Sequence, residues 1–153
     1  MKKQSVKNFK QPSLPLSKID KGTVEIYIDG ASRGNPGNSG LGVLIKDKVG
    51  NIHKIKRSLG ILTNNQAEYE ASITGLNSAK GLKKSHLRIY TDSLLLANQI
   101  NGIWRVNNPK IAILHKKARE LIKGFSQVEV EHIPRELNRE ADKLANQAID
   151  EYP

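Results

Sequence analysis

The sequence of 153 residues contains no cysteine, one tryptophan and no apolar run of the roughly 18 residues that a membrane-spanning helix needs. The absence of cysteine excludes a disulfide scaffold, a thiolate metal site and a cysteine nucleophile. No long apolar stretch follows the basic start MKKQSVKNFK, so export is not expected. These absences predict a cytoplasmic protein with no membrane partner.

Acidic residues are few relative to basic ones, with 15 Asp and Glu against 25 Lys and Arg and a net charge of +10. Such an excess suggests a polyanionic partner, because neutralised phosphates release counterions. Half of the excess lies in residues 1–21, where six lysines accompany one aspartate, so the charge alone is a weak indication. We predict a basic, mobile tail over residues 1–22 and one domain over residues 23–153.

Hydrophobic periodicity predicts the secondary structure. Alternating apolar residues indicate strands over residues 24–29, 41–45, 52–58, 87–92 and 128–133. Three-to-four spacing indicates helices over residues 65–80 and 93–101, and from about residues 109 and 138 onward. A glycine-rich turn is expected over residues 30–37, and Asn64 or Asn65 is expected to cap the first helix. This order predicts an α/β fold with a mixed sheet and helices on its faces.

Two predicted strands end on a carboxylate, Asp29 and Asp92. If these strands are adjacent and parallel, both carboxylates project at the same rim, where ligands collect in α/β sheets. Taken alone, each is equally well explained as a helix cap. Glu68 lies in the first turn of a predicted helix, where it would interact favourably with the helix dipole. Asp142 borders an apolar stripe, where it could pair with a neighbouring Lys or Arg.

Taken together, these four carboxylates would repel one another strongly at one rim unless cations lay between them. Such a cluster suits two Mg²⁺ ions roughly 4 Å apart, the arrangement used in phosphodiester cleavage. Donor sets made only of oxygen favour Mg²⁺, whereas zinc prefers His or Cys. The residues thus point to metal-assisted phosphoryl chemistry, although spacing alone leaves the convergence open.

Four segments in this order resemble those of type I ribonuclease H, in particular its short bacterial and archaeal branch, which is related to the ribonuclease H domains of reverse transcriptases. They are Asp29-Gly30-Ala31-Ser32-Arg33-Gly34-Asn35-Pro36-Gly37, Thr63-Asn64-Asn65-Gln66-Ala67-Glu68, Tyr90-Thr91-Asp92-Ser93 and Asn138-Arg139-Glu140-Ala141-Asp142-Lys143-Leu144-Ala145. The resemblance covers about residues 23–150. It implies a mixed five-stranded sheet, with three antiparallel strands plus two parallel ones.

The resemblance implies endonucleolytic hydrolysis of the RNA strand of RNA–DNA hybrids, leaving 5′-phosphate and 3′-hydroxyl ends. It assigns the catalytic metal-binding acids to Asp29, Glu68, Asp92 and Asp142. Two Mg²⁺ ions would bind with the substrate, Asp29 would bridge them, and Mn²⁺ is an allowed substitute.

The same resemblance implies residues that contact the minor groove of the hybrid, where amide side chains suit base edges and 2′-hydroxyls. These are Gly34, Asn35, Gly37, Asn64, Asn65 and Gln66. Turn formation and helix capping explain the same residues as well.

The sequence departs from the family in two places. Many relatives carry a catalytic histidine in a flexible loop, whereas His132 falls at the end of a predicted strand and is interpreted as a strand histidine. Arg135, in the following loop, is instead the predicted fifth catalytic residue, able to reach the scissile phosphate or leaving group. The short segment before Pro109 leaves little room for the basic, tryptophan-rich protrusion of larger relatives. Trp104 is then either a stacking contact to DNA or a packing residue.

Without that protrusion, we expect weaker, more salt-sensitive binding, with the lysine-rich tail supplying part of the attraction. We expect no obligate protein partner and a monomer, and the Met1 start favours a free-standing enzyme. Two other functions stay open: a non-catalytic nucleic-acid-binding module and a metal-dependent nuclease of structured DNA. The intact acid set argues against the first, and the Asn-Asn-Gln segment argues against the second.

Overall fold

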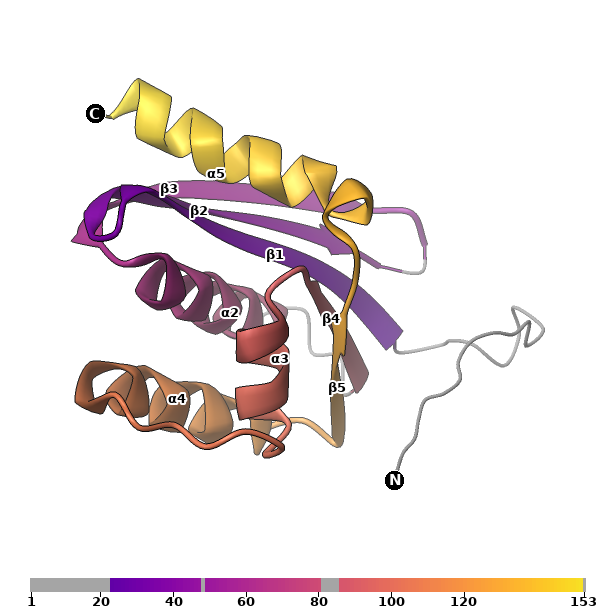
Figure 1. Cartoon of the computed structure of the whole chain (residues 1–153). Coiled ribbons are helices and arrows are strands. Elements are labelled where there is room, and N and C mark those ends of the chain that lie inside the picture. Colours follow the sequence, from indigo (N-terminus) through magenta and orange to yellow (C-terminus); the bar gives the residue numbers. More distant parts are fainter. Residues whose placement is uncertain (1–22, 48, 81–85, 153) are drawn as a thin grey trace.

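The computed structural model describes residues 23–47, 49–80 and 86–152, which form a five-stranded sheet with helices on both faces (Figure 1). The strand order is β3-β2-β1-β4-β5. Three antiparallel neighbours come first in the chain: β1 (Thr23–Gly34), β2 (Gly37–Lys46) and β3 (Ile52–Leu62). Two strands then continue the sheet parallel to β1: β4 (His86–Thr91) and β5 (Gln127–His132). This confirms the predicted mixed sheet, and the predicted tail lies outside the described residues.

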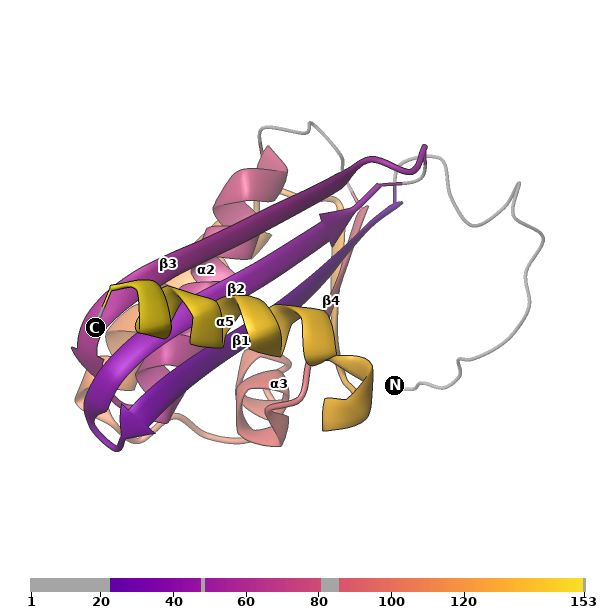
Figure 2. The same ribbon diagram turned by 90° about the horizontal axis from the view of Figure 1, so that it is seen from above.

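The helices form two layers of unequal size. On one face α2 (Asn64–Lys80) packs against β1 and β2, α3 (Leu94–Ile100) packs against β4 and β5, and α4 (Pro109–Ile122) packs mainly against α2 (Figure 1). On the other face α5 (Arg139–Glu151) lies across β1, β2 and β3 after a short 3₁₀ turn over Arg135–Leu137 (Figure 2). Among the described residues, no helix is long and apolar enough to cross a membrane.

The glycine-rich segment over residues 30–37 is mostly strand, so the predicted turn was wrong in its extent. The β1–β2 ladder continues to the pair Gly34 and Gly37, and Asn35 and Pro36 alone reverse the chain. The Ser39 hydroxyl donates a hydrogen bond to the Leu62 carbonyl oxygen at 3.1 Å, which ties the hairpin end to the end of β3. These paired backbone groups outweigh the low strand propensity of glycine.

The first helix is capped by Thr63, so the prediction of Asn64 or Asn65 as the cap was wrong. The Thr63 hydroxyl accepts a hydrogen bond from the Gln66 backbone N–H at 3.1 Å. In return, Gln66 Oε1 accepts one from the Thr63 backbone N–H at 2.9 Å. This reciprocal pair is a capping box, in which two otherwise unpaired N–H groups are satisfied.

Replacing Thr63 by alanine is expected to lower the free energy of unfolding by about 1 kcal/mol, because the N-terminal helix cap is lost. Asn64→Ala serves as the matched control and should change stability by less than about 0.5 kcal/mol. Urea denaturation of both variants measures the difference. Equal losses would contradict the assignment of the cap to Thr63.

Candidate active site

Parallel pairing of β1 and β4 brings two carboxylates to the same rim of the sheet. Ile28 is the register partner of Thr91, so the next residues, Asp29 and Asp92, lie side by side. The cap of α3 is Ser93, whose hydroxyl accepts a hydrogen bond from the Leu96 backbone N–H at 3.1 Å. The carboxylate of Asp92 is therefore not needed for capping.

Glu68 reaches the same rim from α2. It is the fifth residue of that helix, beyond the first turn in which the helix dipole acts strongly on a side chain. Its Oε1 accepts a hydrogen bond from the Gly30 backbone N–H at 3.1 Å. A Cβ at Gly30 would lie 2.2 Å from the Ala67 carbonyl carbon, so only glycine allows β1 and α2 this close together.

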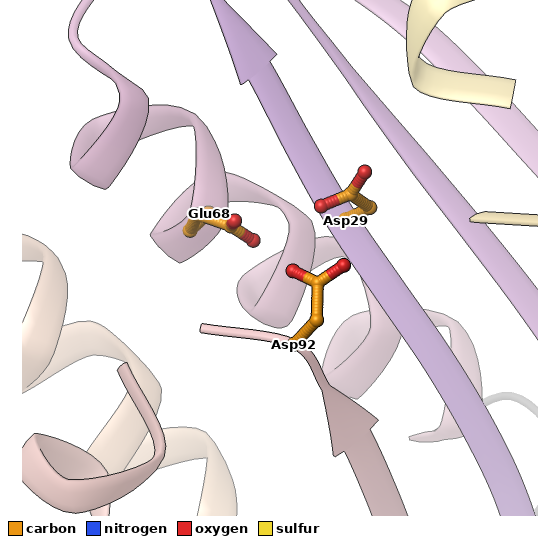
Figure 3. Close-up of side chains that lie close together, drawn as sticks. All are labelled: Asp29, Glu68 and Asp92. Carbon is orange, nitrogen blue, oxygen red and sulfur yellow. The ribbon is translucent and has the colours of Figure 1, made fainter. Parts of the chain in front are cut away.

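Asp29, Glu68 and Asp92 converge from β1, α2 and the end of β4 (Figure 3). One carboxylate oxygen from each lies within 4.8 Å of the others, and Asp29 is only 5% exposed. Carboxylate oxygens at this spacing form a donor set that suits a hard divalent cation such as Mg²⁺ or Mn²⁺.

The fourth acid, Asp142, stands on α5 at the edge of this group. Gly42 is the cross-strand partner of Asp29, and a Cβ there would lie 2.1 Å from the Ala141 carbonyl oxygen. Because Gly42 has no side chain, α5 packs directly against β2, and this places Asp142 beside Asp29. The negative charge of Asp142 is one of the influences that raise the pKa of Asp29.

An open cavity of about 490 Å³ lies over the rim. All four acids line it, together with Arg135, Asn64 and Arg33. The exposed Arg135 guanidinium places Nη2 3.9 Å from Asp142 Oδ1. The cavity is thus lined by acidic groups together with cationic and amide groups. Such a lining suits a phosphodiester that is bound to divalent cations.

Burial is the main cause that raises the pKa of Asp29, and the neighbouring charges of Glu68 and Asp92 raise it further. Burial likewise raises the pKa of Glu68, to which the charge of Asp92 adds. The pKa of Asp92 is raised by burial, against the opposing effects of the Asn138 amide and Arg135. The cation-free cluster therefore retains protons that a bound divalent cation would displace.

The sequence profile described as "Reverse transcriptase-like" matches residues 27–148. Ribonuclease HI of Halobacterium salinarum is 40% identical over 131 residues, which cover 85% of this chain and 66% of that protein. The crystal structure of RNase H1 from the same archaeon superimposes with a TM-score of 0.82 at 40% identity, covering 85% of this chain and 99% of the other. The chain belongs to the ribonuclease H family.

A second solved structure, LC11-RNase H1 in complex with an RNA/DNA hybrid, gives a TM-score of 0.79 at 36% identity, covering 84% of this chain and 97% of the other. The ribonuclease H chain spans 66% of the length of the halobacterial protein and 35% of three mycobacterial relatives. The family predicted from the four segments is thereby confirmed.

The residues predicted to contact substrate lie around the β1–β2 reversal and the start of α2. Asn35 Oδ1 accepts a hydrogen bond from the Asn64 backbone N–H at 3.0 Å, which joins the two segments. Of the predicted set, Asn64 lines the cavity, whereas Gly34, Asn35, Gly37, Asn65 and Gln66 do not. Contact with a hybrid by these residues stays a prediction.

His132 and Trp104, whose roles the sequence analysis discussed, are both exposed. His132 ends β5 as the register partner of Thr91, close enough for its charge to lower the pKa of Asp92. Its place at a strand end agrees with the interpretation as a strand histidine. Trp104 is 44% exposed and is not a core residue, so stacking on DNA stays a prediction for it.

Sequence reasoning missed two asparagines of the candidate site. Asn138 is 1% exposed, and its Nδ2 donates a hydrogen bond to the Ile28 carbonyl oxygen at 2.8 Å, beneath the acids. Asn146 lines the cavity, and its Nδ2 donates to Asp142 Oδ1 at 3.2 Å. The only sequence signal for Asn146 was its spacing of one helical turn from Asp142.

Replacing Asp29 by asparagine is expected to stabilise the cation-free protein by about 1–2 kcal/mol near pH 8. Since the pKa of Asp29 is raised in the folded state, the unfolded chain releases its proton as the pH rises above 3.8 while the folded chain keeps it. The wild type therefore loses stability as the pH rises, and the variant lacks this contribution.

Denaturation in EDTA at about pH 5 and about pH 8 measures the effect, and the advantage of the variant should grow with pH. The exposed Glu136→Gln is the control, for which no comparable gain is expected. An advantage of Asp29→Asn that shrinks toward pH 8 would contradict the assigned burial of this charge.

Proposed function

We propose that this chain is an endonuclease that hydrolyses the RNA strand of RNA–DNA hybrids in a two-metal reaction, with 5′-phosphate and 3′-hydroxyl products. The observation that carries the proposal is the convergence of Asp29, Glu68 and Asp92 within 4.8 Å, with Asp142 beside them. Acids at this spacing, one of them buried and the others half-buried, are costly to a fold, and divalent cations are the simplest reason to keep them.

The four acids are the groups that would hold the cations, and Asp29 is placed centrally among them. Bound Mg²⁺, or Mn²⁺ in its place, would orient and activate the attacking water and stabilise the leaving 3′ oxygen. The chain itself fixes the acids in place. The Gly30 N–H holds the Glu68 carboxylate, and the parallel register of β1 and β4 holds Asp29 next to Asp92. Little reorganisation is then left for the reaction.

Recognition of the hybrid is assigned to the β1–β2 reversal and the first turn of α2. Asn35 and Asn64 are exposed on segments that a hydrogen bond joins, so both can face one groove. Their amides can pair with base edges and 2′-hydroxyls, which distinguish RNA from DNA. The hybrid bound to LC11-RNase H1, 36% identical to this chain, supports the same substrate class here.

Arg135 is assigned to the phosphate. Its side chain is 81% exposed at the cavity, with one end 3.9 Å from Asp142 Oδ1. A guanidinium in this position can move from the carboxylate to a scissile phosphate and stabilise its developing charge. Residues 23–153 form the proposed catalytic domain. The roles of the tail, the monomeric state and the cytoplasmic location stay predictions.

The proposal is tested by cleavage of a labelled RNA–DNA hybrid with Mg²⁺, beside single-stranded RNA and duplex DNA. The wild type should cut the hybrid only, and Asp29→Asn should lower the rate by about 10³-fold or more, because the central carboxylate loses its charge. EDTA should abolish cleavage, and Mn²⁺ should restore it. Binding without cleavage under either metal would favour a non-catalytic module, and cleavage of duplex DNA would favour a DNA nuclease.

Arg135→Ala is expected to lower kcat for the hybrid by about 10²-fold, because a charged donor to the phosphate is lost. His132→Ala, the matched control at the neighbouring strand end, should lower it by less than about 10-fold. Steady-state kinetics of both variants separate the two roles. If His132→Ala lowered kcat more than Arg135→Ala does, the catalytic role would be assigned to His132 instead of Arg135.

A further inference from the structure

A connected row of polar groups leads from the β1–β2 hairpin to the fourth acid. Asp142, Asn146 and Asp150 succeed one another at four-residue spacing on α5, and Arg33, near the end of β1, extends between the last two. Arg33 Nη1 lies 2.7 Å from Asp150 Oδ1, and its Nη2 donates to Asn146 Oδ1 at 3.0 Å. Arg33, Asn146 and Asp142 all line the cavity.

The Asn146 amide is held in one orientation by unlike partners at its two ends. Its Oδ1 accepts from the Arg33 guanidinium, while its Nδ2 donates to the Asp142 backbone carbonyl oxygen at 3.0 Å and to Oδ1 at 3.2 Å. A flipped amide would set N–H groups against the guanidinium and oxygen against the carboxylate. An amide is the group that can bridge a cation and an anion in this way.

Two neighbouring side chains approach the same one of the two Asp142 carboxylate oxygens. Arg135 Nη2 and Asn146 Nδ2 both approach Oδ1, at 3.9 and 3.2 Å. Oδ2 takes part in neither contact. A carboxylate fixed through one oxygen keeps a defined rotamer while the other oxygen stays available to a ligand.

We propose that Asn146, itself oriented by Arg33, is a positioning residue that fixes the Asp142 carboxylate for divalent-cation binding and links the hairpin to the metal site. The inference rests on the proposed function. Because Arg33 and Asp150 are exposed, with side chains 45% and 65% accessible, their ion pair adds little to folding. The contacts instead orient the amide, since the guanidinium bonds it at one end and is anchored by Asp150 at the other.

The sharpest test is Asn146→Asp, which keeps the shape and the acceptor for Arg33 but removes the donor to Asp142. Added negative charge alone would strengthen cation binding, whereas loss of the positioning bond weakens it, so the two explanations have opposite signs. Calorimetric titration of the free protein with Mn²⁺ should show about 10- to 100-fold weaker binding for Asn146→Asp and for Asn146→Ala. Gln147→Ala, which removes the neighbouring amide of α5, is the matched control and should bind as the wild type does.

Kinetics on the hybrid then distinguish positioning from direct contact. The Asn146 variants should need more Mg²⁺ and lose kcat with KM unchanged. Arg33→Ala should act in the same direction, and the double variant should lose no more than Asn146→Ala, because both residues act through one carboxylate. A raised KM for Arg33→Ala that adds to the effect of Asn146→Ala would show that Arg33 contacts the hybrid itself, and would overturn its place in the row.

Unchanged or tighter Mn²⁺ binding by Asn146→Asp would overturn the proposal. If the wild type neither binds Mn²⁺ nor cleaves the hybrid, the proposed function fails, and crystal structures still decide the positioning role. The Asp142 carboxylate should rotate in Asn146→Asp relative to the wild type. An unchanged rotamer would refute positioning whatever the enzyme's activity.

Discussion

Mutual repulsion among carboxylates gathered around the buried Asp29 is the constraint on which the rest of this structure depends. Asp29 is almost fully buried, and Glu68, Asp92 and Asp142 all act to raise its pKa. Such a cluster opposes folding, so the surrounding elements must hold it by packing. The apolar contacts of α2 and α3 with the sheet, of α4 with α2, and of α5 with β1–β3 supply that packing. Part of the stability gained by packing is thereby spent on holding four acidic side chains close together.

The residues proposed for recognition and for catalysis share one hairpin. The β1 strand carries Asp29, then Arg33, and then the reversal at Asn35, which bonds to the start of α2. Arg33 bonds to α5 at Asn146 and Asp150. One strand therefore contacts both helices that supply the remaining off-sheet acids, Glu68 and Asp142. A displacement of the hairpin would be transmitted to both helices, because each is tied to it by hydrogen bonds.

The metal-binding role of the four acids stays a prediction. The sequence predicted the sheet well, because the alternation of apolar residues is a local pattern that reports burial directly. It failed where the outcome depends on partners distant in the chain. The strand character of residues 30–37 comes from the ladder with β2 and from the Ser39 bond to Leu62, which composition alone does not reveal. Thr63 caps α2 because its hydroxyl and the Gln66 side chain each accept a hydrogen bond from the other residue's backbone N–H. Asn146 was missed because its role depends on Arg33, 113 residues away.

Gly30 and Gly42 flank Asp29, one next in the chain and the other across the ladder, and each lets a helix pack closely against its strand. Neither residue has an ionisable group to lose. A screen for inactive variants would nevertheless recover substitutions of these two glycines as well as of the acids, since any side chain there would push the helix that carries Glu68 or Asp142 outward. A larger side chain at either glycine would push its helix away from the sheet and so widen the cavity, but it would also separate the acids of the proposed cation site.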